Sequence, residues 1–149
     1  MKSVMDIGNG RLTCIHYAFC NTLKAMKFTQ DRPASDVNYI RAYGPGRINV
    51  NDRLLKVSLV LTPAMLIENW PPQRFEDITL QHLETALALE PEILLIGTGP
   101  SLQFPEARIM AEIQQRGIGL EVLDTAAACR TYNVLVSENR NVVAALLMI

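Results

Sequence analysis

The sequence is poor in the residues that build metal and disulfide sites. Its 149 residues include three cysteines and two histidines, and no two cysteines have the CxxC spacing. Such a count does not indicate a secreted disulfide framework. Cys14, His16 and Cys20 are three potential zinc ligands, but their spacing matches no zinc module, and incidental thiols in a leader segment are the favoured interpretation. We therefore expect no metal and no cofactor.

An excess of charge and a long apolar run are also missing. Fourteen Lys and Arg against fifteen Asp and Glu give a formal net charge of −1. That is no basic footprint for nucleic acid or an anionic membrane, although local basic patches remain possible. No apolar run reaches the roughly 18–20 residues of a membrane-spanning helix. Residues 12–19 resemble a short signal-peptide core but contain a histidine and lack a convincing cleavage site. We expect a cytoplasmic protein without membrane insertion.

What the sequence does have is enough apolar residues for a substantial core. Hydrophobic residues make up 49% of the chain and charged residues 19%, as in a single globular domain. Residues 1–36 show no clear periodicity, which indicates a flexible N-terminal extension or an artefact of the choice of start site. Regular patterning begins near residue 37, so residues 37–149 are predicted to form one domain.

The first part of this domain is patterned as β structure. Residues 37–43 and 47–51 alternate in polarity around the Gly-Pro-Gly turn at 44–46, which predicts a β-hairpin. Residues 52–62 predict a third strand. One face of that strand would be apolar and the other polar: Leu55, Val57, Leu59 and Leu61 against Lys56 and Ser58.

From residue 79 onward, helical and strand patterns alternate. The predicted segments are a helix at 79–90, a strand at 92–97, a helix at 105–117, a strand at 119–123, a helix at 125–138 and a strand at 141–149. Pro105 is expected as the first residue of its helix, with Gly117 just past the end. Asp124 or Thr125 is expected to cap the last helix. This order predicts a three-layer α/β domain: a central, mostly parallel sheet with helices on its faces, plus the N-terminal β-hairpin subdomain.

Aromatic and histidine side chains of the domain are assigned structural roles. Trp70 precedes two prolines and is expected to pack its ring against the domain. Tyr43 and Tyr132 are expected to be core aromatics with satisfied hydroxyls. His82 lies one position away from the apolar stripe of its helix and is expected at the surface or its boundary.

Four motifs together resemble one known family. They are AYGPG at 42–46, IGTG at 96–99, DTAAACRTYNVL at 124–135, and ENR at 138–140 followed by VVAALL. In order and spacing they are similar to the largely uncharacterised bacterial and archaeal family of Mth938-like domains, which also includes mitochondrial NADH dehydrogenase (complex I) assembly factor three. The resemblance implies an α/β domain with a joined β-hairpin subdomain. It implies no established catalytic residues, and it suggests a role in assembling a respiratory complex.

Two of these motifs define a candidate pocket. Loops at the carboxyl ends of parallel strands share one sheet edge, where ligands commonly bind. The IGTG loop and the start of helix 125–138 should meet there. The candidate residues share this predicted edge: Gly97, Thr98, Gly99, Asp124, Thr125, Cys129, Arg130 and Asn133.

Each candidate also has a structural interpretation. The glycines allow an anion to approach backbone amides, but the loop has neither nucleotide-binding spacing nor a following lysine, so a structural turn or a pocket for an unknown ligand is favoured over a nucleotide site. Cys129 lies beside Arg130 near a helix start, yet an apolar stripe surrounds it, so a buried inert thiol is favoured over a nucleophile. Arg130 and Asn133 bind a ligand or, as we favour, bond to the Asp124 region and a neighbouring loop.

The sequence thus favours a non-catalytic domain that acts through protein partners in an assembly-factor-like role for a membrane-associated complex. The alternative is a small-molecule-binding protein or enzyme that uses the crevice beside Thr98 and Arg130. The sequence leaves the partner, the ligand and the oligomeric state open.

Overall fold

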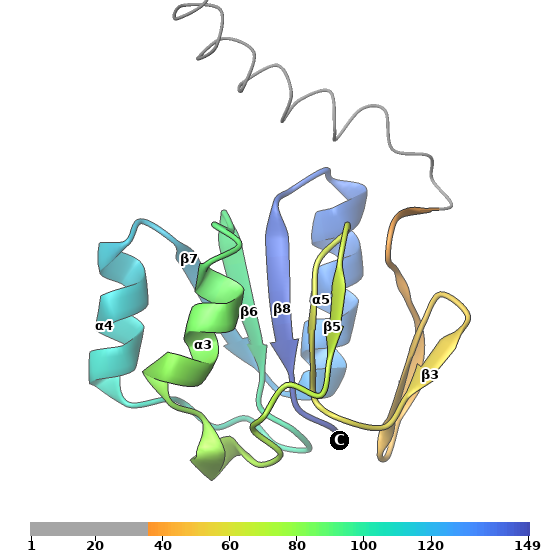
Figure 1. Cartoon of the computed structure of the whole chain (residues 1–149), viewed down its shortest axis with the longest axis horizontal. Coiled ribbons are helices and arrows are strands. Elements are labelled where there is room, and N and C mark those ends of the chain that lie inside the picture. The colour runs from red at the N-terminus through yellow and green to blue at the C-terminus, as the bar shows by residue number, and fades with distance from the viewer. Residues whose placement is uncertain (1–35) are drawn as a thin grey trace, which may run out of the picture. The chain divides into compact units, whose positions relative to one another are not determined.

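A computed structural model describes residues 36–149, and Val37–Ile149 forms one compact unit (Figure 1). The predictions for residues 1–35, including the ligand set of Cys14, His16 and Cys20, lie outside the described residues.

The unit is built on a five-stranded sheet of order β5-β4-β8-β6-β7. Its strands are β4 (Leu59–Leu61), β5 (Leu66–Glu68), β6 (Ile93–Gly97), β7 (Gly119–Leu123) and β8 (Val142–Leu146). The strands β6, β7 and β8 run parallel, whereas β4 pairs antiparallel with both β5 and β8. The predicted α/β fold class is confirmed, and the parallel part of the sheet is the part that the alternating segments predicted.

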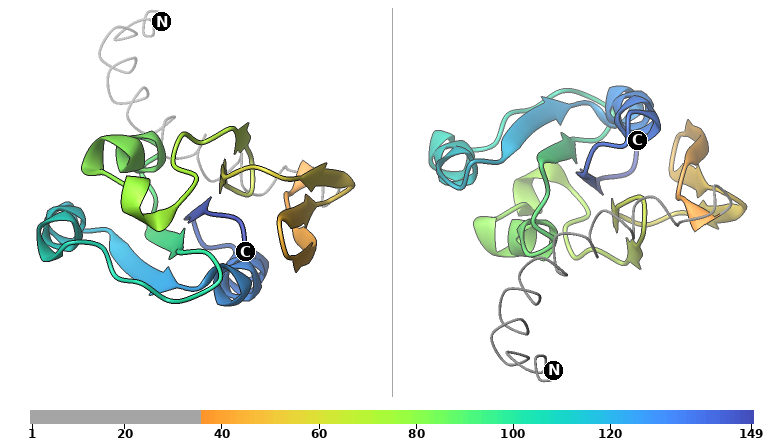
Figure 2. Two further views of the ribbon diagram at one scale, coloured as in Figure 1. Left: turned by 90° about the horizontal axis from the view of Figure 1, so that it is seen from below. Right: turned by 90° about the horizontal axis from the view of Figure 1, so that it is seen from above.

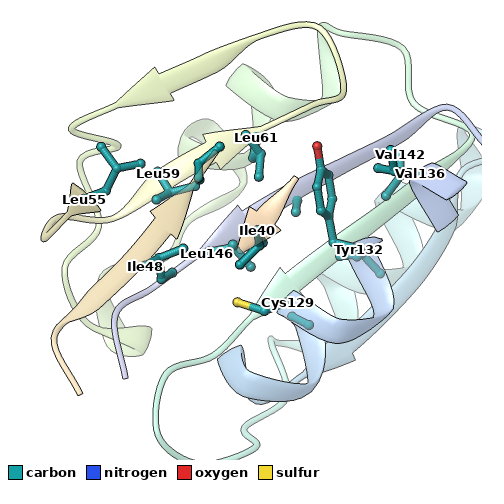
Figure 3. Close-up of a cluster of buried hydrophobic side chains, with 14 residues drawn as sticks. Ile40, Ile48, Leu55, Leu59, Leu61, Cys129, Tyr132, Val136, Val142 and Leu146 are labelled. Atoms are coloured by element: carbon teal, nitrogen blue, oxygen red, sulfur yellow. The ribbon is translucent and has the colours of Figure 1, made fainter. Parts of the chain in front are cut away.

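Side-chain alternation along the central strands divides the core into two layers. Leu95 on β6 joins one apolar cluster, while its neighbours Leu94 and Ile96 join the other. All five residues of β8 are buried, because helices or strands cover both faces of the sheet. Figure 3 shows the first cluster, which lies between the sheet, α5 and the N-terminal strands.

Three helices cover the sheet, as predicted. The helices α3 (Leu80–Leu87) and α4 (Ala107–Gln115) contribute to one cluster, and α5 (Thr125–Ser137) contributes to the other (Figure 2). Asp124 caps α5, since its side chain accepts a hydrogen bond from the Ala127 amide at 2.8 Å. Pro105 is not the first helical residue: it precedes the N-cap Glu106, so the loop continues two residues further than predicted.

A separate antiparallel sheet forms the N-terminal subdomain. It consists of β1 (Ile40–Gly44), β2 (Arg47–Val50) and β3 (Arg53–Leu55) in sequential order, which confirms the predicted hairpin. The single third strand predicted over 52–62 is wrong. The chain leaves the small sheet after Leu55 and enters the large one at Leu59, and Ser58 between them is fully buried instead of facing solvent. The apolar pattern persists across the break because Leu55 and Leu59 pack in the same cluster.

The aromatic predictions hold with one exception. Trp70 is buried, and its Nε1 donates a hydrogen bond to the His82 carbonyl at 3.1 Å; His82 itself is partly buried, at the boundary of the core. Tyr132 is fully buried, with its hydroxyl donating to the Asn38 carbonyl at 3.0 Å. Tyr43 is not a core residue: it lies next to the turn of the hairpin and is 36% exposed.

Candidate functional site

The IGTG loop is tied into the sheet edge by its own backbone. The Thr98 amide donates to the Leu123 carbonyl at 2.9 Å, and the Gly99 amide donates to the Thr125 hydroxyl at 2.8 Å. The Gly97 carbonyl accepts from the Leu147 amide at 3.0 Å. The two amides that an anion would need are therefore already bonded within the protein.

Close packing explains both glycines of this loop. A Cβ atom at Gly97 would lie 2.8 Å from Leu146 Cδ2 and 3.0 Å from Thr125 Oγ1, so an added side chain would force these neighbours to shift. Gly99 has a φ of +97°, a left-handed conformation that favours glycine. These positions need glycine for structural reasons, with no ligand required.

Thr125 closes the junction between the loop, α5 and the end of β8. Its buried hydroxyl donates to the Leu147 carbonyl at 2.7 Å and accepts from the Gly99 amide. The Thr125 amide in turn donates to the Gly99 carbonyl at 2.9 Å. Thr125 therefore fastens three segments that are distant in sequence, all at the carboxyl edge of the sheet.

Thr98 holds the following loop in place. Its side chain is buried, and its hydroxyl donates to the Ser101 carbonyl at 2.7 Å and accepts from the Gln103 amide at 3.2 Å. The loop over 98–106 then presents two apolar side chains to solvent, with Leu102 49% exposed and Phe104 63% exposed. A loop fixed at its base thus displays its apolar residues outward.

Cys129 is buried in the core and not at an accessible edge. Its side chain is fully buried, and Figure 3 shows the sulfur pointing among Ile40, Ile48 and Leu146. Burial raises the pKa of the thiol to about 12 and outweighs the opposing effect of the Arg130 charge. The thiol is therefore protonated at neutral pH, and the burial expected from the sequence is confirmed.

Arg130 and Asn133 both contact the N-terminal sheet. Arg130 Nη1 donates to the Tyr43 hydroxyl at 2.8 Å, and this hydrogen bond raises the pKa of the guanidinium further. Asn133 Nδ2 donates to the Ile40 carbonyl at 2.8 Å, while its Oδ1 accepts from the Ile40 amide at 3.0 Å. The Asn133 amide pairs with the edge of β1 as a neighbouring strand would. The sequence favoured bonds to the Asp124 region and a neighbouring loop, whereas these hydrogen bonds go to Tyr43 and Ile40 of β1.

The eight predicted residues therefore form three groups. Gly97, Thr98, Gly99 and Thr125 make the loop junction, with Asp124 capping the helix beside it. Cys129 belongs to the core, and Arg130 and Asn133 hold the small sheet. Small-molecule binding at this edge stays a prediction. Within residues 36–149, no group of three His, Cys, Asp or Glu side chains is placed to hold a metal ion.

Sequence reasoning overlooked the exposed pair Leu102 and Phe104. The signal was present in the sequence, since the two apolar residues lie in a segment that matches no helix or strand pattern and precedes a proline. An apolar pair outside any regular element has no core face to fill, and it is therefore a candidate for an intermolecular contact.

Comparison with known proteins places these features in a family. Residues 40–147 match the family model described as "Protein of unknown function (DUF498/DUF598)". A solution structure from Bordetella pertussis, described as a Mth938-like domain, superposes with a TM-score of 0.69 at 33% identity and covers 78% of this chain and 89% of that one.

Two curated relatives carry names that bear on function. "NADH dehydrogenase [ubiquinone] 1 alpha subcomplex assembly factor 3" of Danio rerio is 37% identical over 119 residues, which cover 78% of this chain and 67% of the relative. The "13 kDa major membrane protein" of Francisella tularensis is 34% identical over 105 residues, covering 70% of this chain and 85% of the relative. The chain spans about two thirds of the length of the vertebrate assembly factors that it matches. In the described part of this chain, no helix is long and apolar enough to cross a membrane.

Proposed function

We propose that this chain, which belongs to the DUF498/DUF598 family of Mth938-like domains, is an assembly-factor-like protein. It binds a protein partner through the loop at 98–106. In this proposal the protein works in the cytoplasm on a membrane-associated complex. The relatives named as assembly factors support the class of function.

The observation that carries the proposal is the contrast between the base and the tip of the loop. At the base, the Thr98 hydroxyl is bonded to residues 101 and 103. At the tip, Leu102 and Phe104 are exposed to solvent. Exposed apolar side chains on a fixed backbone lose little conformational entropy on binding, which is the property of interface anchor residues.

The neighbouring backbone favours this function over small-molecule binding. The amides of Thr98 and Gly99 and the hydroxyl of Thr125 are bonded within the protein, so a ligand would have to displace these bonds. Docking of a partner on Leu102 and Phe104 leaves all of them intact. A protein contact is therefore the simpler use of this edge.

The test is capture of partners by the full-length chain carrying Leu102→Ser and Phe104→Ser. Truncating an interface anchor costs about 2 kcal/mol or more, or roughly thirtyfold in affinity, so the double variant should lose the proteins that the wild type retains. Val134→Ser is the matched control, because Val134 is 54% exposed on α5, away from the loop. Quantitative mass spectrometry compares the three captured sets. If the loop variant retains the same proteins as the wild type, the loop is not the binding surface.

A further inference from the structure

The near-neutral composition conceals an uneven distribution of charge. Residues 40–56, which form the small sheet and its exit, contain three arginines and one lysine against one aspartate, a net charge of +3. Residues 57–149 contain five arginines against eleven Asp and Glu, a net charge of −6. The small sheet is therefore the basic end of an otherwise acidic unit. It lies at one end of the unit in both views of Figure 2.

The small sheet has one buried face and one free face. Ile40, Ile48, Val50 and Leu55 point into the core. The residues between them face away from it: the register sets Ala42, Asn49 and Leu54 in one cross-strand row on the outer face. Leu54, on the edge strand β3 at one end of that row, is 55% exposed.

Two cations lie beside this row. Ile48 and Leu55 are the last pair of the β2–β3 ladder, and the residue next to each of them is a cation, Arg47 on β2 and Lys56 directly after β3. Both side chains are exposed, and neither forms an ion pair with any described residue. By contrast, Arg53 is neutralised by Glu68 at 2.6 Å.

We propose that the outer face of the small sheet, formed by Arg47, Leu54 and Lys56, docks the protein on an anionic phospholipid surface. The two cations approach the lipid phosphates, and Leu54 beside them enters the interfacial region. The acidic remainder of the unit is repelled by the same surface, so the domain is oriented with the small sheet towards the membrane. The choice of a membrane rests on the proposed function, which places the protein beside a membrane-associated complex.

The test is co-sedimentation of the full-length protein with vesicles at pH 7. Vesicles of phosphatidylcholine alone are compared with vesicles that also contain phosphatidylglycerol. We expect binding to the anionic vesicles, weakened by added salt. Arg47→Glu with Lys56→Glu should reduce the binding at least tenfold, because two attractive charges become repulsive. Leu54→Ser, made on its own in the wild type, should also weaken the binding to anionic vesicles, although it leaves the net charge unchanged.

The control variant is Arg74→Glu with Arg108→Glu, which makes the same change in net charge on exposed residues outside the small sheet. Thermal melting confirms that each variant is folded. Equal binding to both kinds of vesicle, or an equal loss in the control variant, would overturn the inference. Binding of an acidic peptide such as poly-glutamate through the same residues, without vesicle binding, would overturn it in favour of a protein ligand.

The two proposals can fail separately. The Leu102→Ser, Phe104→Ser variant should bind anionic vesicles like the wild type, while the Arg47→Glu, Lys56→Glu variant should retain the protein partners. If the wild type captures its partners through the loop but does not bind anionic vesicles, the lipid inference is wrong and the proposed function stands. Failure of loop-dependent capture, with vesicle binding intact, removes the proposed function.

Discussion

Asn133 offers the sharpest test of how α5 holds the small sheet. Its side-chain amide makes two hydrogen bonds with the backbone of Ile40, a residue that is 5% exposed. In Asn133→Ala, the Ile40 amide and carbonyl lose their partners at a site where water has little access. Each buried polar group left without a partner costs about 1–3 kcal/mol of stability. Water can partly reach β1 because it is an edge strand, so we expect the two groups together to cost about 2–3 kcal/mol.

The assay is thermal and urea unfolding of the full-length chain at pH 7. A domain of this size melts about 4–5 °C lower for each kcal/mol lost, so Asn133→Ala should melt about 8–15 °C below the wild type. Ser137→Ala is the control, because Ser137 is an exposed residue of the same helix and its removal should change the stability by less than about 0.5 kcal/mol. If Asn133→Ala melts within 2 °C of the control, and their free energies of unfolding differ by ~0.5 kcal/mol or less, the two Asn133 hydrogen bonds do not hold the small sheet.

Asn133→Asp separates the donor from the acceptor. The carboxylate still accepts from the Ile40 amide, but its second oxygen then faces the Ile40 carbonyl, and the two acceptors repel. Protonation restores a donor, so folding raises the pKa of this carboxyl. The restored stability is fully present below the unfolded pKa of about 3.9 and is lost as the pH rises through the folded value. The gap in stability between Asn133→Asp and the wild type should therefore narrow as the pH falls. A gap that does not depend on pH would contradict the assigned geometry.

Three further predictions follow from buried or paired groups. In a variant lacking the other two cysteines, Cys129 should react with a thiol reagent at neutral pH only as fast as the protein unfolds. The reason is that the thiol is buried and its pKa is raised to about 12. Rapid labelling of the folded protein would contradict this. Gly97→Ala should lower the stability by about 1–3 kcal/mol in urea unfolding, because its Cβ would lie 3.0 Å from Thr125 Oγ1; an unchanged midpoint would show that the junction adjusts freely. Arg140 lowers the pKa of Glu92 from 4.5, so their ion pair stabilises the fold above pH 4.5, and this stabilisation is lost as the pH falls through the folded pKa. In Arg140→Gln, the free energy of unfolding should therefore fall less steeply as the pH is lowered. The same steepness as in the wild type would exclude this contribution.

Local patterns predicted the elements because each element satisfies its own periodicity. The stripe of Leu80, Leu83 and Leu87 predicts α3, and the cap at Asp124 predicts the start of α5. The prediction failed where two strands of different sheets share one apolar pattern. Residues 55–61 alternate as one strand would, yet the chain changes sheets at 56–58, and both strands still point their leucines into the same core.

The candidate site was predictable as a place but not as a set of contacts. The order of strands and helices brings the IGTG loop and the start of α5 to one sheet edge, and the structure has them in direct contact through Gly99 and Thr125. Which hydroxyl satisfies which amide depends on the approach of β8, whose Leu147 carbonyl accepts from Thr125. That partner is 22 residues away in sequence, and no local pattern identifies it.

By itself, the sequence determined the α/β class and the alternation of elements, because these depend on periodicity, caps and turn residues that act over a few positions. The family resemblance rests on four motifs in their order and spacing. The tertiary structure alone decided that Asn133 acts as a neighbour for β1 and that Leu54 lies beside Asn49 on the outer face of the small sheet. Burial and cross-strand register arise from segments that meet only when the chain folds, so the chemistry of these side chains is set by neighbours that are distant in sequence.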